Sequence, residues 1–457
     1  MTYILLVDFG STYTKLTAVD LKKRDIIATA SYYSTVLDDI KVGYTKALES
    51  LIQKTGSLTY DKKLACSSAK GGLKMAAIGL VPELTVEAAK RTCMGAGAKV
   101  DMVFAYQLTQ SDIEQIAQGD IDIILLAGGT DGGNQKMVRH NISMIAKAGL
   151  HIPVIYAGNQ ALVDEVKAQF KGNVEYYIVP NIMGKLNKLN MTEAKETIND
   201  IFLRHIIKAN GIKGIEALID KVIYPTPEAV LKASLLLSKG INEDGLGDLM
   251  VVDVGGATTD VYSMSDGMPS RMDVIVRGLE EPFDKRTVEG DLGLRYSSKG
   301  ILNHLTKQDK KALLDQNIDI EHEVMLRTNE PTYISTDKKA VYVDGVIAKK
   351  CIETSVKRHV GQLEPYYTLE GNVFYQVGKD LSRTPIIIGT GGPIIYSPHK
   401  KEILSEALGI KQDLMDLRPK EASLYIDKDY ILQAMGLLTT IDAQAALDIM
   451  KKRIVKL

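Results

Sequence analysis

Residues 7–15 read VDFGSTYTK, and residues 251–263 read VVDVGGATTDVYS. Each stretch is an apolar run that ends in an aspartate, passes through a short turn of small and hydroxyl residues, and resumes as a second β-rich run. An aspartate at the end of a buried strand is costly unless a cation or a polar group meets it. Glycines and hydroxyl residues in the turn let the backbone approach an anion closely. Each stretch therefore predicts a β-hairpin whose turn faces an anionic ligand, with a nucleotide as the working hypothesis.

The repetition is more informative than either hairpin alone. One such turn occurs in many proteins, but two copies about half a chain apart are typical of a duplicated domain that closes on one ligand from both sides. A third element, IIIGTGGP at 386–393, is an apolar strand that runs into a glycine-rich turn. Without side chains, this turn lets the backbone reach a flat or anionic ligand.

Length and composition indicate a globular protein of two or more domains. The chain has 457 residues, of which 45% are hydrophobic and 25% charged, and its formal net charge is −1. This balance provides no basic field for nucleic acid and no polybasic segment for a membrane surface. The absence of Trp and the presence of only 6 Phe also argue against a single-strand stacking platform. We expect neither a nucleic-acid partner nor a membrane.

The three cysteines, Cys66, Cys93 and Cys351, are far apart and show no CxxC spacing. Such an arrangement favours reduced thiols over a disulfide framework or a zinc site. The first apolar run, residues 3–7, is short, lacks a basic flank and is interrupted by Asp8, so it is not expected to be a signal peptide. We expect a cytoplasmic protein.

Hydrophobic periodicity gives a coarse map of the elements. Residues 85–180 alternate between helical and strand patterns with short glycine loops, which predicts βαβ units around a parallel sheet. Residues 192–220 read as largely helical, and residues 225–240 as a helix opened by proline and closed by Gly240. Residues 300–330 read as charged surface helix, 341–347 and 374–378 as weak strands, and 430–454 as a helix or helix pair.

The order of these motifs resembles the actin-like ATPase superfamily, which includes sugar kinases and heat-shock chaperone ATPases. The superfamily shares a first phosphate hairpin, a connecting helix (here 227–238), a second phosphate hairpin, an adenosine loop and a final connecting helix (here 432–438). The resemblance implies an α/β fold with two duplicated ribonuclease-H-like lobes around a nucleotide cleft. It places the first lobe at 1–240 with a βαβ-rich region at 85–205, the second lobe at 246–432, and a C-terminal helix at 433–457 that returns to the first lobe.

The same resemblance assigns site residues for a Mg²⁺-dependent ATPase that binds ATP. Asp8 and Asp253 are expected to hold Mg²⁺ through water, and carboxylates with N–H donors are indeed what a metal–nucleotide needs. Glu228 stands where the superfamily's helix orients the attacking water, although an acidic residue in a first turn is also an ordinary helix-dipole partner. The residues expected to contact phosphate or adenosine are Gly10, Ser11, Thr12, Lys15, Gly255, Gly256, Thr258, Thr259, Gly389, Gly391 and Gly392.

A narrower resemblance rests on VDFGSTYTKLTAVD at 7–20, ILLAGGTDGGN at 124–134 and KRTVEGDLGLR at 285–295. Together they are similar to the MutL/GlmL accessory proteins, which are encoded with adenosylcobalamin-dependent glutamate mutase and related aminomutases and are unrelated to the mismatch-repair protein of similar name. The resemblance implies an ATPase that reactivates its mutase by helping to exchange damaged cobalamin. The expected partners are the subunits of a cobalamin-dependent mutase or aminomutase, and a homodimer is compatible with the sequence.

Two loops keep alternative interpretations. Gly290 and Asp291 face ribose or phosphate in one interpretation and belong to a charged helix cap in the other. The loop 127–134 is a tight βα turn in the interpretation we favour, and a contact for the nucleotide or for the partner's corrinoid in the second.

Other functions are compatible with the same motifs. A small-molecule kinase would need a catalytic aspartate just ahead of the second hairpin, where Asp244 and Asp248 lie. An iron–sulfur activator of an acyl-CoA dehydratase would need a cysteine pair, for which Cys66 and Cys93 are the candidates, but the second hairpin reads GGATTDV in place of that family's GGQD. A non-catalytic scaffold or filament protein is the remaining class.

Overall fold

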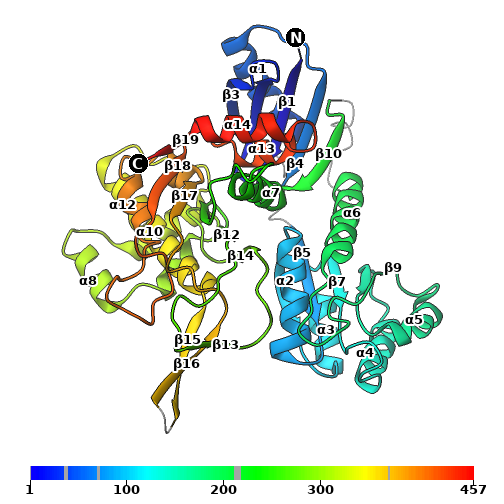
Figure 1. The fold of residues 1–457 in the computed structure, drawn as a ribbon. Helices are drawn as coiled ribbons and strands as arrows, with labels where there is room; N and C mark the ends of the chain where they lie inside the picture. Colours follow the sequence, from blue (N-terminus) through cyan, green and yellow to red (C-terminus); the bar gives the residue numbers. More distant parts are fainter. Residues whose placement is uncertain (1, 35–39, 69–72, 210–217, 369–370) are drawn as a thin grey trace. The chain divides into compact units, whose positions relative to one another are not determined.

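The computed structural model describes residues 2–34, 40–68, 73–209, 218–368 and 371–457. The chain folds into two compact units (Figure 1). Unit 1 combines Met1–Gly71, Gly214–Arg277 and Glu281–Leu457, and unit 2 combines Gly72–Lys213 with Gly278–Glu280. Unit 1 contains both hairpins and the glycine-rich turn. The two units are defined by their compactness, whereas the lobe boundaries expected from the sequence follow the order of the superfamily's motifs. Those boundaries therefore stay a prediction.

The first sheet of unit 1 has the strand order β10-β4-β1-β2-β3. β1 pairs antiparallel with β2 and parallel with β4, and β4 pairs parallel with β10. The turn of the first hairpin is closed by a hydrogen bond from the Gly10 N–H to the Tyr13 carbonyl, 3.1 Å. The strands are β1 (Tyr3–Phe9), β2 (Tyr13–Asp20), β3 (Asp25–Tyr33), β4 (Lys62–Ser67) and β10 (Lys221–Pro225), and α1 (Ile40–Thr55) packs on β2 and β3.

The second sheet of unit 1 repeats this topology. Its order is β14-β12-β11-β17-β18-β19, with antiparallel pairing from β14 to β12 to β11 and parallel pairing from β11 to β17 to β18. The order and directions match those of the first sheet, with β19 added at the edge. This duplication confirms the expected fold, an actin-like arrangement of two ribonuclease-H-like sheets. The strands are β11 (Leu249–Val254), β12 (Thr259–Met264), β14 (Asp284–Glu289), β17 (Ile386–Thr390), β18 (Ser423–Asp427) and β19 (Ile454–Lys456).

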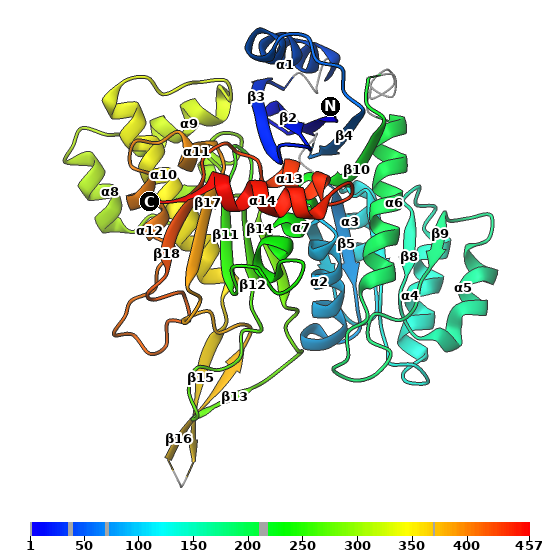
Figure 2. The same ribbon diagram turned by 45° about the horizontal axis from the view of Figure 1, so that its top comes forward.

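Three helices form a common core with both sheets. α7 (Thr226–Lys239) crosses α13 (Leu432–Leu438), and α14 (Ala443–Arg453) follows α13 (Figure 2). Gly436 permits the close crossing, because a Cβ atom there would lie 1.9 Å from the Ala229 carbonyl oxygen. The expected C-terminal helix pair is therefore confirmed, and it is joined by the short strand β19.

The weak strand expected at 341–347 is wrong, because this segment lies inside α10 (Lys338–His359). Asp337 caps the helix by accepting a hydrogen bond from the Ala340 N–H, 2.9 Å. Val343, Ile347 and Cys351, four residues apart, are fully buried in the core of the second sheet. Tertiary burial of one helical face therefore overrides the β-branched local sequence.

The remaining elements of unit 1 surround the second sheet. The strand expected at 374–378 is confirmed as β16 (Gly371–Val377), which forms a small sheet with β15 (Gln362–Thr368) and β13 (Val274–Val276) (Figure 2). The helices are η4 (Ser298–Asn303), α8 (Lys307–Leu314), α9 (Ile320–Asn329), α11 (Gly392–Ile395) and α12 (Lys400–Ser405). Of these, η4, α8 and α9 agree with the helical reading of residues 300–330.

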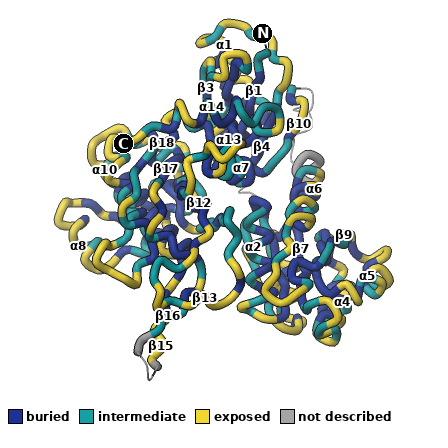
Figure 3. The backbone as a smooth tube through the Cα atoms, in the orientation of Figure 1, coloured by how far each residue is buried: buried dark blue, intermediate teal, exposed yellow. Residues whose placement is uncertain are grey.

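Unit 2 is a doubly wound α/β domain. Its five strands are all parallel, in the order β6-β5-β7-β8-β9, as the alternating pattern predicts. α2 and α6 pack on one face of the sheet and α3, α4 and α5 on the other, and the central strands are buried (Figure 3). The strands are β5 (Lys74–Ile78), β6 (Lys99–Phe104), β7 (Ile123–Leu126), β8 (Val154–Tyr156) and β9 (Tyr176–Ile178). The helices are η2 (Pro82–Val86), α2 (Glu87–Gly95), α3 (Gln110–Gln118), α4 (Lys136–Lys147), η3 (Gln160–Leu162), α5 (Val163–Phe170) and α6 (Thr192–Ala209).

The helical reading of 192–220 is confirmed as far as Ala209, and residues 210–217 lie outside the described residues. Within the described ranges, no helix combines the length and apolar character that crossing a membrane requires.

A buried lysine lies under the small sheet of β13, β15 and β16. Lys379 is 0% exposed, and its Nζ donates to the carbonyl oxygen of Phe283, 2.7 Å away. Burial and the charge of Lys285 lower its pKa to about 7. The unfolded chain therefore binds a proton more tightly at this site than the folded protein does.

This difference predicts a pH-dependent stability. Between the folded pKa, about 7, and the unfolded value, about 10.4, folding releases the proton, so the free energy of unfolding should rise as pH increases across this range. The contribution reaches at most about 1.4 kcal/mol per pH unit. Lys379→Met should remove that slope in urea unfolding at pH 7, 8 and 9, whereas exposed Lys428→Met should keep it. Equal slopes in both variants would contradict the assignment.

Candidate functional site

The first hairpin places a buried aspartate between a lysine and a threonine. Asp8, at the end of β1, is 3% exposed. Its Oδ2 lies 2.7 Å from the Lys15 ammonium on β2, and its Oδ1 accepts a 2.7 Å hydrogen bond from Thr226 Oγ1 at the start of α7. The Lys15 ammonium also lies 3.9 Å from the centre of the Tyr430 ring. These contacts resolve the cost of burying an aspartate at a strand end.

Lys15 stays charged in this setting. Burial alone lowers its pKa, but the carboxylates of Asp8 and Asp253 outweigh burial and raise the pKa above its ordinary value. The two hairpins approach each other, since Thr12 Oγ1 of the first turn lies 2.8 Å from where a Cβ atom of Gly256 in the second turn would stand. A permanently charged lysine between two acidic residues is suited to bind an anion together with a cation.

The second hairpin holds its aspartates differently. Asp253 on β11 faces Asp260 on β12 in the strand register. Asp260 is tied to the buried Arg286 guanidinium, 2.7 Å away, and accepts a hydrogen bond from Thr258 Oγ1, 3.0 Å. Burial, followed by the Asp260 carboxylate, raises the pKa of Asp253 to about 7. A cation beside Asp253 would reverse this effect, since it would favour the ionised carboxylate.

Three buried oxygens at the hairpins lack a hydrogen-bond partner within the described part of the chain, namely Asp253 Oδ1, Thr12 Oγ1 and Thr14 Oγ1. Thr12 lies in the first turn, and its Oγ1 is 2.8 Å from where a Cβ atom of Gly256 would stand in the second turn. Unpaired buried oxygens are uncommon and call for a missing partner. A divalent cation with its water and a phosphate group fits the donors present here, because Mg²⁺ prefers carboxylate oxygens, water and phosphate.

The glycine-rich turn after β17 packs directly on the second hairpin. Gly391 has φ +91°, and a Cβ atom there would lie 2.2 Å from the Val254 carbonyl oxygen and 2.7 Å from Asp253 Oδ1. A Cβ atom at Gly392 would make only ordinary contact with the Tyr396 ring, 3.8 Å away. Gly391 is therefore required by the protein itself, whereas Gly392 leaves its surface free for a ligand.

Asp427 connects this turn to the final connecting helix. Its carboxylate accepts a hydrogen bond from Thr390 Oγ1, 3.0 Å, and caps α13 by accepting from the N–H groups of Ile431 and Leu432. Burial raises the pKa of Asp427 to about 6. Tyr430, which lies against Lys15, is held three residues further along. Asp427 thus joins the glycine-rich turn to α13, and Tyr430, just ahead of α13, joins it to the first hairpin through Lys15.

The other expected residues lie around this centre. Glu228 is buried in the first turn of α7, two residues after Thr226, and its carboxylate lies 3.4 Å from Lys232. Gly290 belongs to the loop after β14, where its carbonyl accepts a hydrogen bond from Ser297 Oγ, 3.1 Å. Asp291 is exposed in the same loop. Ligand contacts for all three stay predictions, as they do for Gly10, Ser11, Gly255, Thr259 and Gly389 in the turns and strands described above.

The expected loop at 127–134 lies in unit 2 and is tied to its neighbours. Asp131 Oδ1 accepts hydrogen bonds from the Gln160 N–H, 3.0 Å, and from Asn181 Nδ2, 2.9 Å. Asn159 Oδ1 accepts from the Gly132 N–H, 3.2 Å. These bonds join the loops after β7, β8 and β9 and support the interpretation as a structural turn.

Sequence reasoning did not identify five residues at the centre, namely Thr226, Asp260, Arg286, Asp427 and Tyr430. Thr226 is the first residue of α7 and Asp427 the last residue of β18, and neither stands at an N-cap, which is Pro225 for α7 and Ile431 for α13, so neither carries a local capping signal. Asp260 falls inside the quoted second hairpin. Nothing local marks Arg286 or Tyr430, whose roles depend on contacts with distant segments.

The two glycines of the turn provide a matched test of this geometry. Gly391→Ala should lower the thermal unfolding temperature markedly, since the new Cβ atom would collide with backbone and the left-handed φ is unfavourable for alanine. Gly392→Ala should unfold at nearly the wild-type temperature. Equal melting temperatures for the two variants would contradict the packing described here.

The sequence matches the family model described as "MutL protein" over residues 4–454. "Protein MutL" from Clostridium tetanomorphum is 47% identical over 461 residues, which cover 100% of both chains. Among solved structures, component A of (R)-2-hydroxyglutaryl-CoA dehydratase from Acidaminococcus fermentans is 11% identical with a TM-score of 0.32, covering 99% of each chain. Xylulose kinase from Lactobacillus acidophilus is 10% identical with a TM-score of 0.36, covering 100% of this chain and 93% of its own. TM-scores this low do not establish a shared fold, which rests here on the repeated strand order.

Proposed function

Because the chain belongs to the MutL family, we propose that it is an accessory ATPase that binds Mg²⁺–ATP at the two hairpins and reactivates a cobalamin-dependent mutase or aminomutase. Hydrolysis would drive the exchange of damaged cofactor on that partner. The observation that carries the ATPase proposal is the approach of the duplicated hairpins, with the Asp8–Lys15 ion pair, 2.7 Å, on the first and Asp253 at the corresponding place on the second. The unpaired oxygens of Asp253 and Thr12 support a ligand at this point.

The chain's own residues define the roles. Asp8 and Asp253 would hold the cation through water, and Lys15 would turn from Asp8 toward the phosphates. Ser11, Thr12, Gly255, Gly256 and Thr258, in the two turns, would surround the β- and γ-phosphates. Mg²⁺, when bound, neutralises charge that develops on the transferred phosphoryl group.

The metal role predicts a large loss of activity from a small change. Asp8→Asn and Asp253→Asn should each reduce ATP hydrolysis by about a hundredfold, because each removes a charge that stabilises the transition state through the cation. Nucleotide binding should persist in part, since the backbone N–H groups of the turns remain. Phosphate release is the measurement, and exposed Asp315→Asn serves as the control. Wild-type rates in both hairpin variants would disprove the double-hairpin site.

Glu228 would orient the attacking water. Its position, buried in the first turn of the helix whose Thr226 contacts Asp8, brings it to the same end of α7 as the proposed metal site. A carboxylate there can accept the proton of the water as it attacks the γ-phosphate.

The partner role is tested together with Glu228. Adding a cobalamin-inactivated aminomutase should stimulate phosphate release by the wild-type protein and restore mutase activity. Glu228→Gln should bind Mg²⁺–ATP normally, hydrolyse it about 10- to 1,000-fold more slowly, and hold the partner without reactivating it. Hydrolysis at the wild-type rate would remove Glu228 from the mechanism, and an inactive mutase that stays inactive with wild-type protein and ATP would refute the partner proposal.

The alternative functions have weaker support. A kinase base at Asp244 would have to leave its contact with Lys451, 3.0 Å, and the Ile241 N–H that it caps. For an iron–sulfur activator, the candidate thiols Cys66 and Cys93 are both buried, and burial raises the pKa of each. Asp244 is therefore not free to act as a kinase base, and the two buried thiols are not exposed to bind an iron–sulfur cluster.

A further inference from the structure

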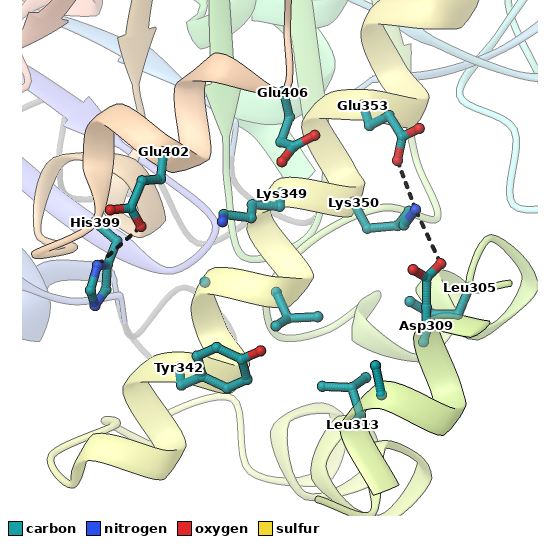
Figure 4. A pocket seen from close by; sticks show the side chains of 13 residues that line it. Leu305, Asp309, Leu313, Tyr342, Lys349, Lys350, Glu353, His399, Glu402 and Glu406 are labelled. Carbon is teal, nitrogen blue, oxygen red and sulfur yellow. Dashed lines mark hydrogen bonds and ion pairs between the residues drawn. The ribbon is translucent and has the colours of Figure 1, made fainter. Parts of the chain in front are cut away.

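A cavity of about 470 Å³ lies between α8, α10 and α12 in unit 1 (Figure 4). Its volume is within the range typical of small-molecule sites. Leu313 and Val346 give it an apolar floor together with Leu305, just ahead of α8. None of the lining residues belongs to the hairpins or to the glycine-rich turn, so the cavity is not explained by the proposed ATPase chemistry.

Two consecutive lysines of α10 extend to different sides of the cavity, because successive residues of a helix point about 100° apart (Figure 4). Lys350 is satisfied, with its ammonium 2.7 Å from Glu353 and 3.4 Å from Asp309. Lys349 points the other way, toward Glu402 and Glu406 of the α12 segment (Figure 4). The charges on the Lys350 side of the cavity are therefore paired. The Lys349 side, which we call the open wall, faces Glu402 and Glu406.

The open wall holds an unpaired acid and an unpaired base. Among the residues that the structure describes, neither the Lys349 ammonium nor the Glu406 carboxylate comes within 4.0 Å of an opposite charge. Glu402 is engaged by His399, 3.2 Å away. Opposite charges that face the same space without meeting leave room for a molecule that carries both signs.

This arrangement discriminates between ligand classes. A purely anionic ligand drawn to Lys349 would meet the carboxylates of Glu402 and Glu406, and a purely cationic ligand would meet Lys349. A zwitterion can place its carboxylate on Lys349 and its ammonium on Glu406, and each such charge-assisted hydrogen bond is stronger than a neutral one. The apolar floor favours an uncharged, apolar remainder.

We propose that this cavity is an effector site for an α-amino acid with an apolar side chain. The site lies on α12, which begins eight residues after Gly392, so an occupant that holds α12 against α10 acts on the segment that leads from the glycine-rich turn. The proposal does not depend on ATP hydrolysis or on the identity of the partner, because binding can be measured on the full chain alone.

Calorimetric titration of the full-length protein with L-leucine tests the site. Saturable binding is expected. 4-Methylpentanoate, which lacks the amine, and isoamylamine, which lacks the carboxylate, should each bind at least about tenfold more weakly, since each leaves one protein charge unpaired. Lys349→Met and Glu406→Gln should also weaken leucine binding at least about tenfold, whereas Lys401→Met, the same change on an exposed neighbouring lysine of α12, should not.

Each remaining outcome would overturn the proposal. These outcomes are no saturable heat with leucine, equal binding of leucine and its singly charged analogues, and Lys349→Met or Glu406→Gln behaving like Lys401→Met. Competition between ATP and leucine would instead assign the cavity to the nucleotide site. Thermal unfolding of each variant shows whether it is folded, and the ligand analogues test the site on wild-type protein even where a variant is not.

Discussion

The buried carboxylate of Asp8 determines how the centre of unit 1 is assembled. Burying it at the end of β1 is costly without polar partners, and the contacts around it join three parts of the chain. Lys15 is its neighbour across the hairpin, Thr226 opens α7 more than 200 residues later, and Tyr430 covers the lysine from the start of α13. Asp8 is 3% exposed and Lys15 is 17% exposed, so removing one member would leave a largely buried charge uncompensated. The first sheet and the two connecting helices therefore depend on one electrostatic contact.

The second hairpin repeats the strand pattern but not the pairing. Among the residues that the structure describes, Asp253 has no cationic side chain within 4.0 Å, and Arg286 of the same sheet is engaged by Asp260. The aspartate of the first hairpin is therefore paired, whereas burial and the Asp260 carboxylate raise the pKa of Asp253. This asymmetry within a duplicated frame supports the proposed cation site, because an incoming cation would supply the charge that the second hairpin lacks.

The fold could be predicted from the sequence wherever the signal was local. The strand–Asp–turn–strand pattern at residues 7–15 and its repeat at 251–263 are written in consecutive residues, as is the alternation of unit 2. The segment 341–347 was misread because its β-branched residues are locally strand-like, and only burial against the second sheet makes them helical. Arg286 and Tyr430 were missed for a related reason, since their function arises from partners that lie far away in the chain. The ligand contacts of the turns remain predictions, because they depend on segments that are far apart in the chain.

The position of unit 2 in the chain has a consequence for biosynthesis. β4 and β10 are adjacent parallel strands, yet Lys63 and Asp220, which hydrogen-bond at their start, are 157 residues apart, and unit 2 occupies the interval. At about 5–20 residues per second, a ribosome needs roughly 8 to 30 s to traverse that interval. During this time β4 presents an unpaired sheet edge, which is a template for wrong pairing. Unit 2 is itself contiguous apart from three residues and can fold as soon as it emerges, so a nascent chain would carry a finished inserted domain beside an unfinished first sheet.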